Sequence, residues 1–340
     1  MSTAELIERV FLTAWVWYQA GDLNIDLQTV TLLGGYDQVR KEKDDMKKIA
    51  LLLTIVLGMN TSPACAQSDP DWLRAPYLNT VLSLEHESAM RDFYGTVLGL
   101  ESQPDINLPA RVGRPFDTIM IRYRVGKSVI KMIPHEDIGR PPGGRDTAAG
   151  LRVLSIPIAD GDGVAARVKA SNGSEIEWLE ELGYRVGWVR DPDDNEIELR
   201  WYSGDASGDD LGRLELCITA SDVDATAYHY GKRLGLYELP SSELKGFPGT
   251  TRRFKVGESV LRIWNPGKKL SADAGFTKDG YGLRYVQFIV KDAYDLHAKL
   301  VERKAGIAQE PTPLGRSTTL LFAKDPDGVI NECVGPAKGK

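Results

Sequence analysis

The sequence has little histidine and little cysteine. Its 340 residues include four histidines and three cysteines. Three cysteines are too few for a disulfide framework, and none of them forms a Cys-x-x-Cys pair of the kind that holds zinc. Four histidines also limit any site that binds a transition metal through imidazole groups. The composition therefore indicates neither a disulfide-stabilised nor a zinc-stabilised fold.

The chain also lacks an excess of positive charge and a long apolar run. It contains 42 Lys and Arg against 48 Asp and Glu, a formal net charge of −6, so we expect no nucleic-acid partner. The apolar run at 49–58 is about half the length of roughly 20 residues that a bilayer span requires. We therefore expect no stable membrane span in the mature chain. Nothing in the sequence predicts an oligomeric state.

That apolar run has the surroundings of a secretory signal. Met46-Lys47-Lys48 precedes it, and the small-residue segment Ala64-Cys65-Ala66 follows it. A basic segment, a short apolar run and an A-x-A site are typical of a signal peptide, which we predict over residues 46–66 with cleavage after Ala66. A buried helix is the alternative interpretation of the run.

The position of this signal leaves two interpretations of residues 1–45 open. Either Met46 is the true start and residues 1–45 are an upstream extension outside the native protein, or these residues are a cytoplasmic segment before a signal anchor. A start at Met46 predicts a periplasmic or secreted protein. The second interpretation predicts no location.

From Tyr77 onward the chain repeats itself. The segment 79–99 is similar to 215–235, and Asp191-Pro-Asp-Asp-Asn-Glu-Ile-Glu198 is similar to Asp325-Pro-Asp-Gly-Val-Ile-Asn-Glu332. In both cases the copy lies about 135 residues further along, which indicates a duplicated architecture. We predict two domains of the same kind, over residues 77–203 and 211–336.

Each predicted domain divides again into two modules. Alternating strands at 151–160 and 283–292 open the second halves, and helical segments follow them at 164–170 and 293–303. In the first halves, Ser88 and Asp222 are candidate N-caps of the helix. Gly99 and Gly235 are candidates for the left-handed position that ends it. Four modules of one strand, one helix and several strands are expected.

Two motifs connect this pattern to a known superfamily. Phe93-Tyr94-Gly-Thr-Val-Leu-Gly-Leu100 follows a first strand, and the Asp-Pro-Asp segments at 191 and 325 precede a last strand. Over about residues 77–336 the chain resembles the vicinal-oxygen-chelate superfamily, which includes glyoxalase I, extradiol dioxygenases and bleomycin-resistance proteins. The resemblance implies an α+β fold of four βαβββ modules, paired into two glyoxalase-like domains with open, U-shaped mixed sheets.

In that superfamily the metal ligands project from the first and last strands of each module. The resemblance places these positions at Asn79, Lys131, Val153 and Glu198 in the first predicted domain, and at Glu215, Arg262, Tyr285 and Glu332 in the second. None of these residues is a histidine. We expect His229 in the core and His86, His135 and His297 at the surface.

The cations at these positions argue against a resident metal. Lys131 is expected to pair with Glu198, and Arg262 to lie between Glu215 and Glu332, where it supplies the positive charge of a metal and repels one. We therefore expect an exported protein that binds a small organic molecule without a cofactor. The residues expected to bind that molecule are Arg262, Tyr285, Trp264, Lys131, Glu198 and Asn79.

Two alternatives from other functional classes stay open. One is a metal-dependent lyase or dioxygenase of the glyoxalase or extradiol type, with Glu215 and Glu332 as ligands of a divalent metal and as the catalytic carboxylates. The other is a non-catalytic scaffold that binds a partner through loops such as 140–145. The sequence does not decide whether the protein is an enzyme, or whether Cys217 and Cys333 form a disulfide.

Overall fold

The computed structural model describes residues 69–108, 117–135, 138–139, 144–181, 183–202, 208–272 and 275–338. The predicted signal peptide at 46–66, the segment 1–45 and residues 140–143 of the loop at 140–145 lie outside the described residues. Residues 69–340 form one compact unit. No helix in the described part of the chain combines the length and the apolar character needed to cross a membrane.

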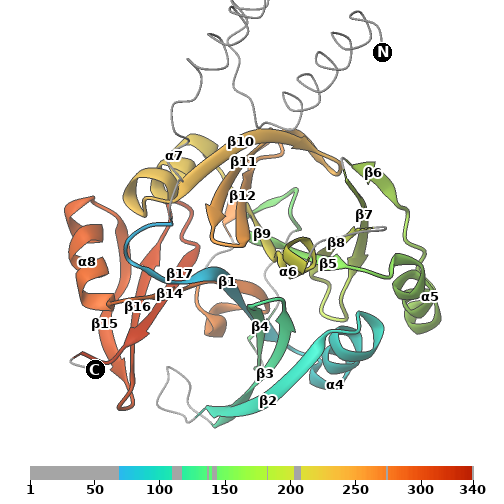
Figure 1. Cartoon of the computed structure of the whole chain (residues 1–340), viewed down its shortest axis with the longest axis horizontal. Coiled ribbons are helices and arrows are strands. Elements are labelled where there is room, and N and C mark those ends of the chain that lie inside the picture. Colours follow the sequence, from blue (N-terminus) through green and yellow to red (C-terminus); the bar gives the residue numbers. More distant parts are fainter. Residues whose placement is uncertain are drawn as a thin grey trace, which may run out of the picture. The chain divides into compact units, whose positions relative to one another are not determined.

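Four modules with the same element order make up this unit (Figure 1). The first contains β1 (Leu73–Leu84), α4 (Glu87–Asp92), the π-helical turn η3 (Phe93–Val97), β2 (Glu101–Leu108), β3 (Thr118–Val125) and β4 (Ser128–Pro134). The second contains β5 (Ala148–Ile158), α5 (Gly161–Asn172), β6 (Leu179–Glu181), β7 (Tyr184–Arg190) and β8 (Glu196–Trp201).

The second half of the chain repeats this order after the short helix α6 (Gly208–Gly212). The third module contains β9 (Glu215–Thr219), α7 (Val223–Tyr228), the π-helical turn η4 (His229–Arg233), β10 (Tyr237–Leu244), β11 (Phe247–Val256) and β12 (Ser259–Trp264). Strand β13 (Ser271–Ala272) and the 3-10 turn η5 (Thr277–Asp279) lead to the fourth, with β14 (Gly282–Val290), α8 (Ala293–Glu302), β15 (Gly306–Leu314), β16 (Thr318–Lys324) and β17 (Ile330–Pro336). The expected α+β fold of four βαβββ modules is confirmed.

The ends of the first-half helices show how the local sequence forms them. Asp222 caps α7 by accepting a hydrogen bond from the Ala225 amide, as predicted. The predicted cap at Ser88 is wrong, because the N-cap of α4 is His86, whose side chain makes no capping bond. Gly99 and Gly235 have φ values of 73° and 77°, the left-handed conformation expected at the end of a helix.

The modules pair crosswise to form two sheets. The first and fourth modules form an eight-stranded sheet in the order β15-β16-β17-β14-β1-β4-β3-β2. The second and third form a nine-stranded sheet in the order β10-β11-β12-β9-β5-β8-β7-β6, with β13 beside β5. The central strand pairs β1–β14 and β5–β9 therefore join modules from opposite halves of the chain. The ranges 77–203 and 211–336 each hold two modules, but as domain boundaries they stay a prediction.

The two faces of each sheet are packed differently. One apolar core joins both sheets and the helices, and it includes Leu82, Leu154 and Phe288. The opposite face of the eight-stranded sheet carries a separate apolar cluster around Tyr285. The corresponding face of the nine-stranded sheet carries another around Trp264. Because side chains alternate along a strand, polar residues two positions from these clusters lie on the same, helix-free faces.

The Asp-Pro-Asp turns connect consecutive modules that lie in different sheets. The Asp193 carboxylate accepts a hydrogen bond from the Glu85 amide at 2.8 Å, just after β1. The Asp327 carboxylate accepts one from the Ser221 amide at 2.9 Å, just after β9. These contacts explain why the motif occurs in both halves of the chain, and the one at Asp193 also binds the amides at the start of α4.

The first aspartate of each motif is buried. Asp325 is 4% exposed and accepts hydrogen bonds from the amides of Asp327 and Val329 at 3.0 and 2.8 Å. Both bonds go to Oδ1, and Oδ2 has no partner among the described residues. Burial raises the pKa of Asp325 to about 7, against only partial compensation from these amides.

We expect Asp325→Asn to stabilise the protein at pH 8 and to have little effect at pH 4. The folded state takes up a proton at Asp325 near pH 7 and the unfolded state near pH 4, so the stability that this carboxyl contributes is complete below pH 4 and is lost as the pH rises through 7. Asparagine keeps the acceptor at Oδ1 and removes the charge, which should stabilise the protein by up to about 4 kcal/mol at pH 8. Urea unfolding at both pH values, with the exposed Asp295→Asn as control, measures this difference. The same gain at both pH values would contradict the assignment.

Candidate functional site

The central strands of each sheet place four polar side chains at equivalent positions on the helix-free face. In the nine-stranded sheet, the "Arg262 quartet" consists of Ser155 on β5, Glu198 on β8, Glu215 on β9 and Arg262 on β12. In the eight-stranded sheet, the "Lys131 quartet" consists of Gln287 on β14, Glu332 on β17, Asn79 on β1 and Lys131 on β4. Ser155 lies opposite Glu215 just as Gln287 lies opposite Asn79, so the two sets correspond position by position.

The structure brings the predicted site residues together in different combinations from those expected from the sequence. Lys131 shares its sheet with Glu332 and not with Glu198, and Arg262 shares its sheet with Glu198 and Glu215 and not with Glu332. Glu215 and Glu332 belong to different sheets and cannot bind one metal ion together. The groupings fail because the antiparallel pairs β1–β14 and β5–β9 join modules from opposite halves of the chain.

Two members of the quartets were absent from the sequence prediction. Ser155 and Gln287 occupy the positions assigned to Val153 and Tyr285, which lie two residues earlier on the same strands. A shift of two residues keeps a side chain on the same face, so alternation alone does not detect it. Val153 and Tyr285 accordingly pack in the apolar clusters beside the quartets.

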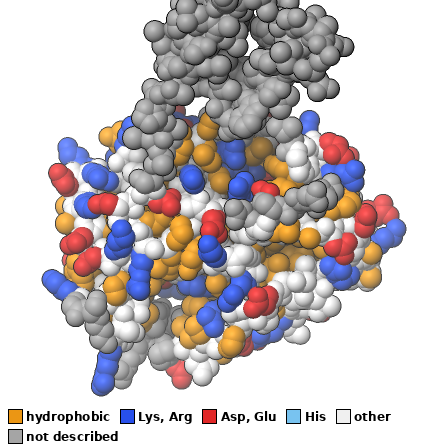
Figure 2. All heavy atoms as spheres, in the orientation of Figure 1, with side chains coloured by type: hydrophobic (Ala, Val, Ile, Leu, Met, Phe, Trp, Pro, Cys, Tyr) orange, Lys and Arg blue, Asp and Glu red, His pale blue; other side chains and the backbone are white. Residues whose placement is uncertain are grey.

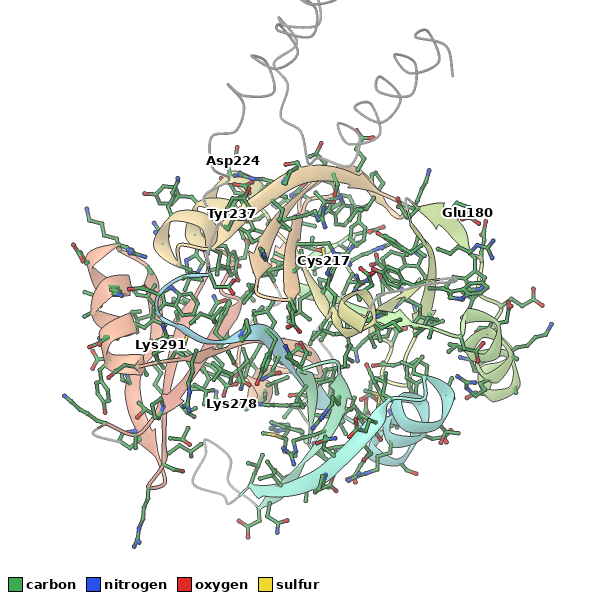
Figure 3. The ribbon with its side chains drawn as sticks, viewed as in Figure 1. Glu180, Cys217, Asp224, Tyr237, Lys278 and Lys291 are labelled. Carbon is green, nitrogen blue, oxygen red and sulfur yellow. The ribbon has the colours of Figure 1, made fainter. Side chains whose placement is uncertain are left out.

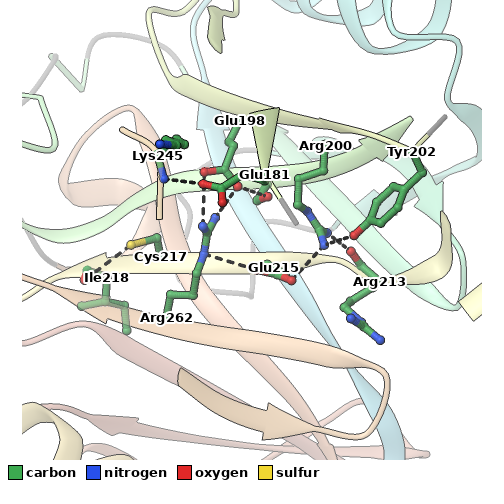
Figure 4. Close-up of polar contacts among 11 residues, drawn as sticks. Glu181, Glu198, Arg200, Tyr202, Arg213, Glu215, Cys217, Ile218, Lys245 and Arg262 are labelled. Atoms are coloured by element: carbon green, nitrogen blue, oxygen red, sulfur yellow. Dashed lines mark hydrogen bonds and ion pairs between the residues drawn. The ribbon is translucent and has the colours of Figure 1, made fainter. Parts of the chain in front are cut away.

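The Arg262 quartet contains a buried, bidentate ion pair between Arg262 and Glu198 (Figure 4). Arg262 donates from Nη2 to Glu198 Oε1 at 2.7 Å and from Nη1 to Glu198 Oε2 at 3.2 Å. The Ser155 hydroxyl donates to the same carboxylate at 2.5 Å. Arg262 and Glu198 are 1% and 2% exposed. Burial alone would lower the pKa of Arg262, but Glu198 and Glu215 raise it above its ordinary value, so this guanidinium stays charged.

A second arginine completes this network. Arg200 Nη1 donates to Glu215 Oε1 at 2.8 Å and to the Tyr202 hydroxyl at 3.1 Å. Arg262 Nε lies 3.4 Å from the other oxygen of Glu215. Burial raises the pKa of Glu215, and the two guanidinium groups outweigh it and hold the pKa below its ordinary value. Two positive and two negative groups therefore balance within the sheet.

The Lys131 quartet contains one full charge of each sign and two amides. Lys131 Nζ donates to Gln287 Oε1 at 2.5 Å, and Asn79 Nδ2 donates to the same oxygen at 2.9 Å. The Gln287 amide nitrogen donates to Glu332 Oε2. Burial lowers the pKa of Lys131 and raises that of Glu332, although each charge partly offsets the shift of the other. This site is less completely charge-paired than the Arg262 quartet.

A pocket of about 710 Å³ opens next to the Arg262 quartet. Its aromatic part is formed by Phe247 and Trp264, whose rings meet edge to face at 5.3 Å. The Phe247 ring lies 5.0 Å from the Arg262 guanidinium and 5.1 Å from that of Arg145, which also lines the pocket. Trp264 was expected to contact a ligand, and it does line the pocket. Arg262 lies behind Phe247 and is absent from the pocket wall.

Arg145 is held over aromatic rings with part of its hydrogen-bonding capacity unused. Its guanidinium carbon lies 4.0 Å from the Trp188 ring, and its Nε lies 3.0 Å from Glu196 Oε2. Arg145 Nη1 and Trp188 Nε1 are buried donors with no acceptor among the described residues. Gly246, with φ at 81°, allows this packing because a Cβ there would lie 2.8 Å from the Trp188 ring.

The remaining predicted residues have structural surroundings. The Tyr285 hydroxyl accepts a hydrogen bond from the Thr277 amide, and its ring contacts Phe276 and Phe322 edge to face. Cys217 and Cys333 are both free and buried, in different sheets. Figure 3 shows Cys217 in the interior, with Glu180 and Asp224 at the periphery.

The histidines differ from the expectation at one position. His229 is fully buried, as predicted, and burial lowers its pKa to about 4. The side chain of His86 is 57% exposed and His297 is half-buried. The predicted surface position of His135 is wrong, because it is 5% exposed beneath Tyr281, whose hydroxyl donates to its carbonyl oxygen.

Neither quartet fits the metal site that the fold suggests. A divalent ion at either place would lie against Arg262 or Lys131, and like charges at this distance repel strongly away from water. The Glu198 carboxylate is already bound on both oxygens, and the amides of Asn79 and Gln287 are bound to their neighbours. Oxygen and nitrogen donors committed in this way offer a poor set of ligands.

Within the described residues one other cluster could hold a metal ion, formed by Glu85, His86 and Asp193. The Asp193 carboxylate already accepts the amides of Glu85 and His86, and His86 Nδ1 lies 2.7 Å from it. Asp327 makes the corresponding contact with Ser221 where no histidine is present. The cluster is therefore explained by the connection between modules.

On the visible face of the molecule, charged side chains of both signs are interspersed with hydrophobic ones (Figure 2). The arrangement agrees with the near balance of 42 basic and 48 acidic residues in the sequence. The charges that distinguish this structure lie inside it, in the two quartets.

Comparison with known proteins finds one matching family model, over part of the chain, and a shared fold. Residues 212–333 match the sequence profile of the Glyoxalase/Bleomycin resistance protein/Dioxygenase superfamily. No curated protein matches the chain. The structure is similar to glyoxalase I from Zea mays, with a TM-score of 0.59 and 16% identity over 76% of this chain and 91% of that one. It is also similar to a putative dioxygenase from Bacillus subtilis, with a TM-score of 0.56 and 15% identity over 77% and 85%. At these identities the structural likeness establishes the fold alone.

We expect Arg262→Met to destabilise the protein by about 3–5 kcal/mol, because it leaves the buried Glu198 and Glu215 carboxylates without their shared cation. Replacing Glu198 by Met in the same protein should recover part of this loss. Chemical denaturation measures both effects, with Lys169→Met in an exposed ion pair as control. A loss no larger than that of the control would mean that the buried pair contributes little.

Proposed function

We propose, on the premise that residues 212–333 belong to the Glyoxalase/Bleomycin resistance protein/Dioxygenase superfamily, that this protein binds a small organic anion in the pocket beside the Arg262 quartet, without a resident metal. The observation that carries the proposal is Arg145, which lines a pocket of about 710 Å³ beside Phe247 and Trp264 and whose Nη1 has no acceptor among the described residues. A buried donor without an acceptor is costly, and an anionic ligand bound next to Arg145 would satisfy it.

The pocket chemistry supports a flat ligand with a carboxylate or similar group. Phe247 and Trp264 provide an apolar surface on which a ring can stack. Arg145 is oriented by Trp188 and Glu196, so its guanidinium loses little freedom when it binds an anion. The volume lies within the range of roughly 300–1,000 Å³ that small-molecule sites occupy.

The metal-independent part of the proposal follows from the quartets. Arg262 supplies a fixed positive charge next to the pocket, separated from it by the Phe247 ring. That charge is permanent and needs no ion to be recruited. The alternative of a metal-dependent lyase or dioxygenase loses its expected donor set, because Glu215 and Glu332 lie in different sheets.

We expect 2-naphthoate to bind in this pocket and to quench tryptophan fluorescence. Replacing Arg145 by Leu should weaken this binding about tenfold, because it removes a charge-assisted hydrogen bond. The uncharged 2-naphthalenemethanol should bind the variant and the unchanged protein with similar affinity. Dialysis against a chelator should leave naphthoate binding unaltered.

The matched control is Arg190→Leu. Arg190 shares the Glu196 carboxylate with Arg145 but does not line the pocket. Its loss should leave the affinity for naphthoate unchanged. Equal weakening by both substitutions would show a general effect on the loop, and loss of binding on chelation would contradict the metal-independent site.

We further propose that the protein is exported through the signal at 46–66, and this proposal is supported by the sequence alone. Expression from Met46 in a Gram-negative host should yield a periplasmic or secreted chain that begins at Gln67, as measured by intact mass. Replacing Lys47 and Lys48 by Glu should retain the uncleaved precursor in the cytoplasm. An uncleaved chain in the cytoplasm from the unchanged sequence would contradict export.

A further inference from the structure

A second pocket lies outside both quartets. It has a volume of about 410 Å³ and lies between α7 and η4 of the third module and strands β15 and β16 of the fourth. The residues that line it include Tyr228, Arg233, Gly306, Lys324, Asp325 and Pro326. None of them belongs to a quartet or to the pocket that contains Arg145. Its volume lies within the range of roughly 300–1,000 Å³ that small-molecule sites occupy.

Arg233 provides a cation whose hydrogen-bonding groups are not all used. Its guanidinium carbon lies 5.5 Å from the centre of the ring of Tyr228, a residue that is 55% exposed. Its Nε is a buried donor with no acceptor among the described residues. Val97 ends η3 at the equivalent place in the first module, so the repeated fold does not require an arginine here. An acceptor on a ligand would remove the cost of this unsatisfied donor.

Lys324 brings a second cation to the same pocket. It is the last residue of β16 and is exposed. Its stem packs over Gly306, where a Cβ would lie 2.8 Å from Lys324 Cγ. The two cations and the single carboxyl of Asp325 give the lining a net positive charge, which favours an anionic ligand.

Asp325 adds an acceptor to these donors. It is 4% exposed, and its Oδ2 has no partner among the described residues. At the equivalent aspartate of the second module, Asp191 Oδ2 accepts hydrogen bonds from Asn195 at 2.9 Å and from the Tyr94 hydroxyl at 3.0 Å. The repeated motif has Val329 in place of Asn195, so Asp325 lacks that amide. A donor on a ligand would take its place.

We propose that this second pocket binds a small hydroxy acid. The ligand carboxylate binds Arg233 and Lys324, and its hydroxyl donates to the Asp325 carboxylate. The apolar part of the ligand packs against the Tyr228 ring. A carboxylate without a hydroxyl fits less well, because Asp325 offers it no donor and repels its charge. The proposal is independent of the function proposed for the pocket at Arg145, with which this site shares no residue.

The test is isothermal titration calorimetry of the full chain with mandelate at pH 8, which is above the pKa of Asp325. Mandelate should bind about tenfold more tightly than phenylacetate, which has the same ring and carboxylate but no hydroxyl. It should exceed the uncharged mandelamide by a similar factor. Equal affinity for mandelate and phenylacetate would overturn the proposal.

Substitution of Arg233 locates the site. Arg233→Val introduces the side chain that the first module has at this place, and it should weaken mandelate binding about tenfold. The matched control is Lys232→Val, because Lys232 is the exposed neighbour and does not line the pocket. It removes the same charge and should leave the affinity for mandelate unchanged. Equal weakening by both substitutions would contradict a site at Arg233.

Three further variants make the outcome decisive. Asp325→Asn should abolish the preference for mandelate over phenylacetate, because a donor replaces one carboxylate oxygen; a purely structural carboxyl would leave this preference unchanged. Lys324→Gln changes an exposed residue, so the protein should fold as before and bind mandelate more weakly. Unchanged affinity in Lys324→Gln would count against the proposal.

Arg145→Leu separates this site from the other pocket. Mandelate binding should be the same in this variant as in the unchanged protein, and Arg233→Val should leave naphthoate binding unaltered. Loss of mandelate binding in Arg145→Leu would place mandelate in the first pocket and overturn the second site. Failure of one site is thereby distinguishable from failure of the other.

Discussion

The nine-stranded sheet must keep the buried side chains of Arg262 and Glu198 in contact with each other. Both charges are almost completely removed from water, and neither is tolerable there without the other. Ser155, Glu215 and Arg200 extend the pair into a network in which every charge has a partner. Because the arginine occupies the centre of this face, the site already contains its own positive charge. The carboxylate of Glu198 is therefore committed to Arg262 and is a poor ligand for a divalent ion.

The crosswise pairing of modules makes this network possible. Glu198 and Arg262 come from different halves of the duplicated sequence, and they meet only because β5 and β9 are antiparallel neighbours at the centre of the sheet. The Asp-Pro-Asp turns then connect consecutive modules. Asp193 joins the second module to the first, and Asp327 joins the fourth module to the third. The chain is thus joined in two ways, by strand pairing between distant modules and by turn contacts between consecutive ones.

The two quartets show how one architecture supports two different environments. At the position equivalent to Glu215 the other sheet has Asn79, and at the position equivalent to Ser155 it has Gln287. These exchanges remove one negative charge and place an amide between Lys131 and Glu332. In the first site every charge is paired, and the pocket lies beside it. The second keeps an amine and a carboxyl whose pKa values are shifted toward each other by burial.

The sequence by itself determined the four modules, the helix ends at Gly99 and Gly235, and the cations at 131 and 262, because alternation, turn residues and repeated motifs are local properties of the chain. It also indicated that these cations oppose a metal. Only the tertiary structure decided which residues meet: Lys131 with Gln287 and Glu332, Arg262 with Glu198, and Arg145 over Trp188. The physical reason is that these contacts depend on which distant strands pair. The residue pattern within each strand is the same whichever module lies beside it, so the local sequence does not identify the partner.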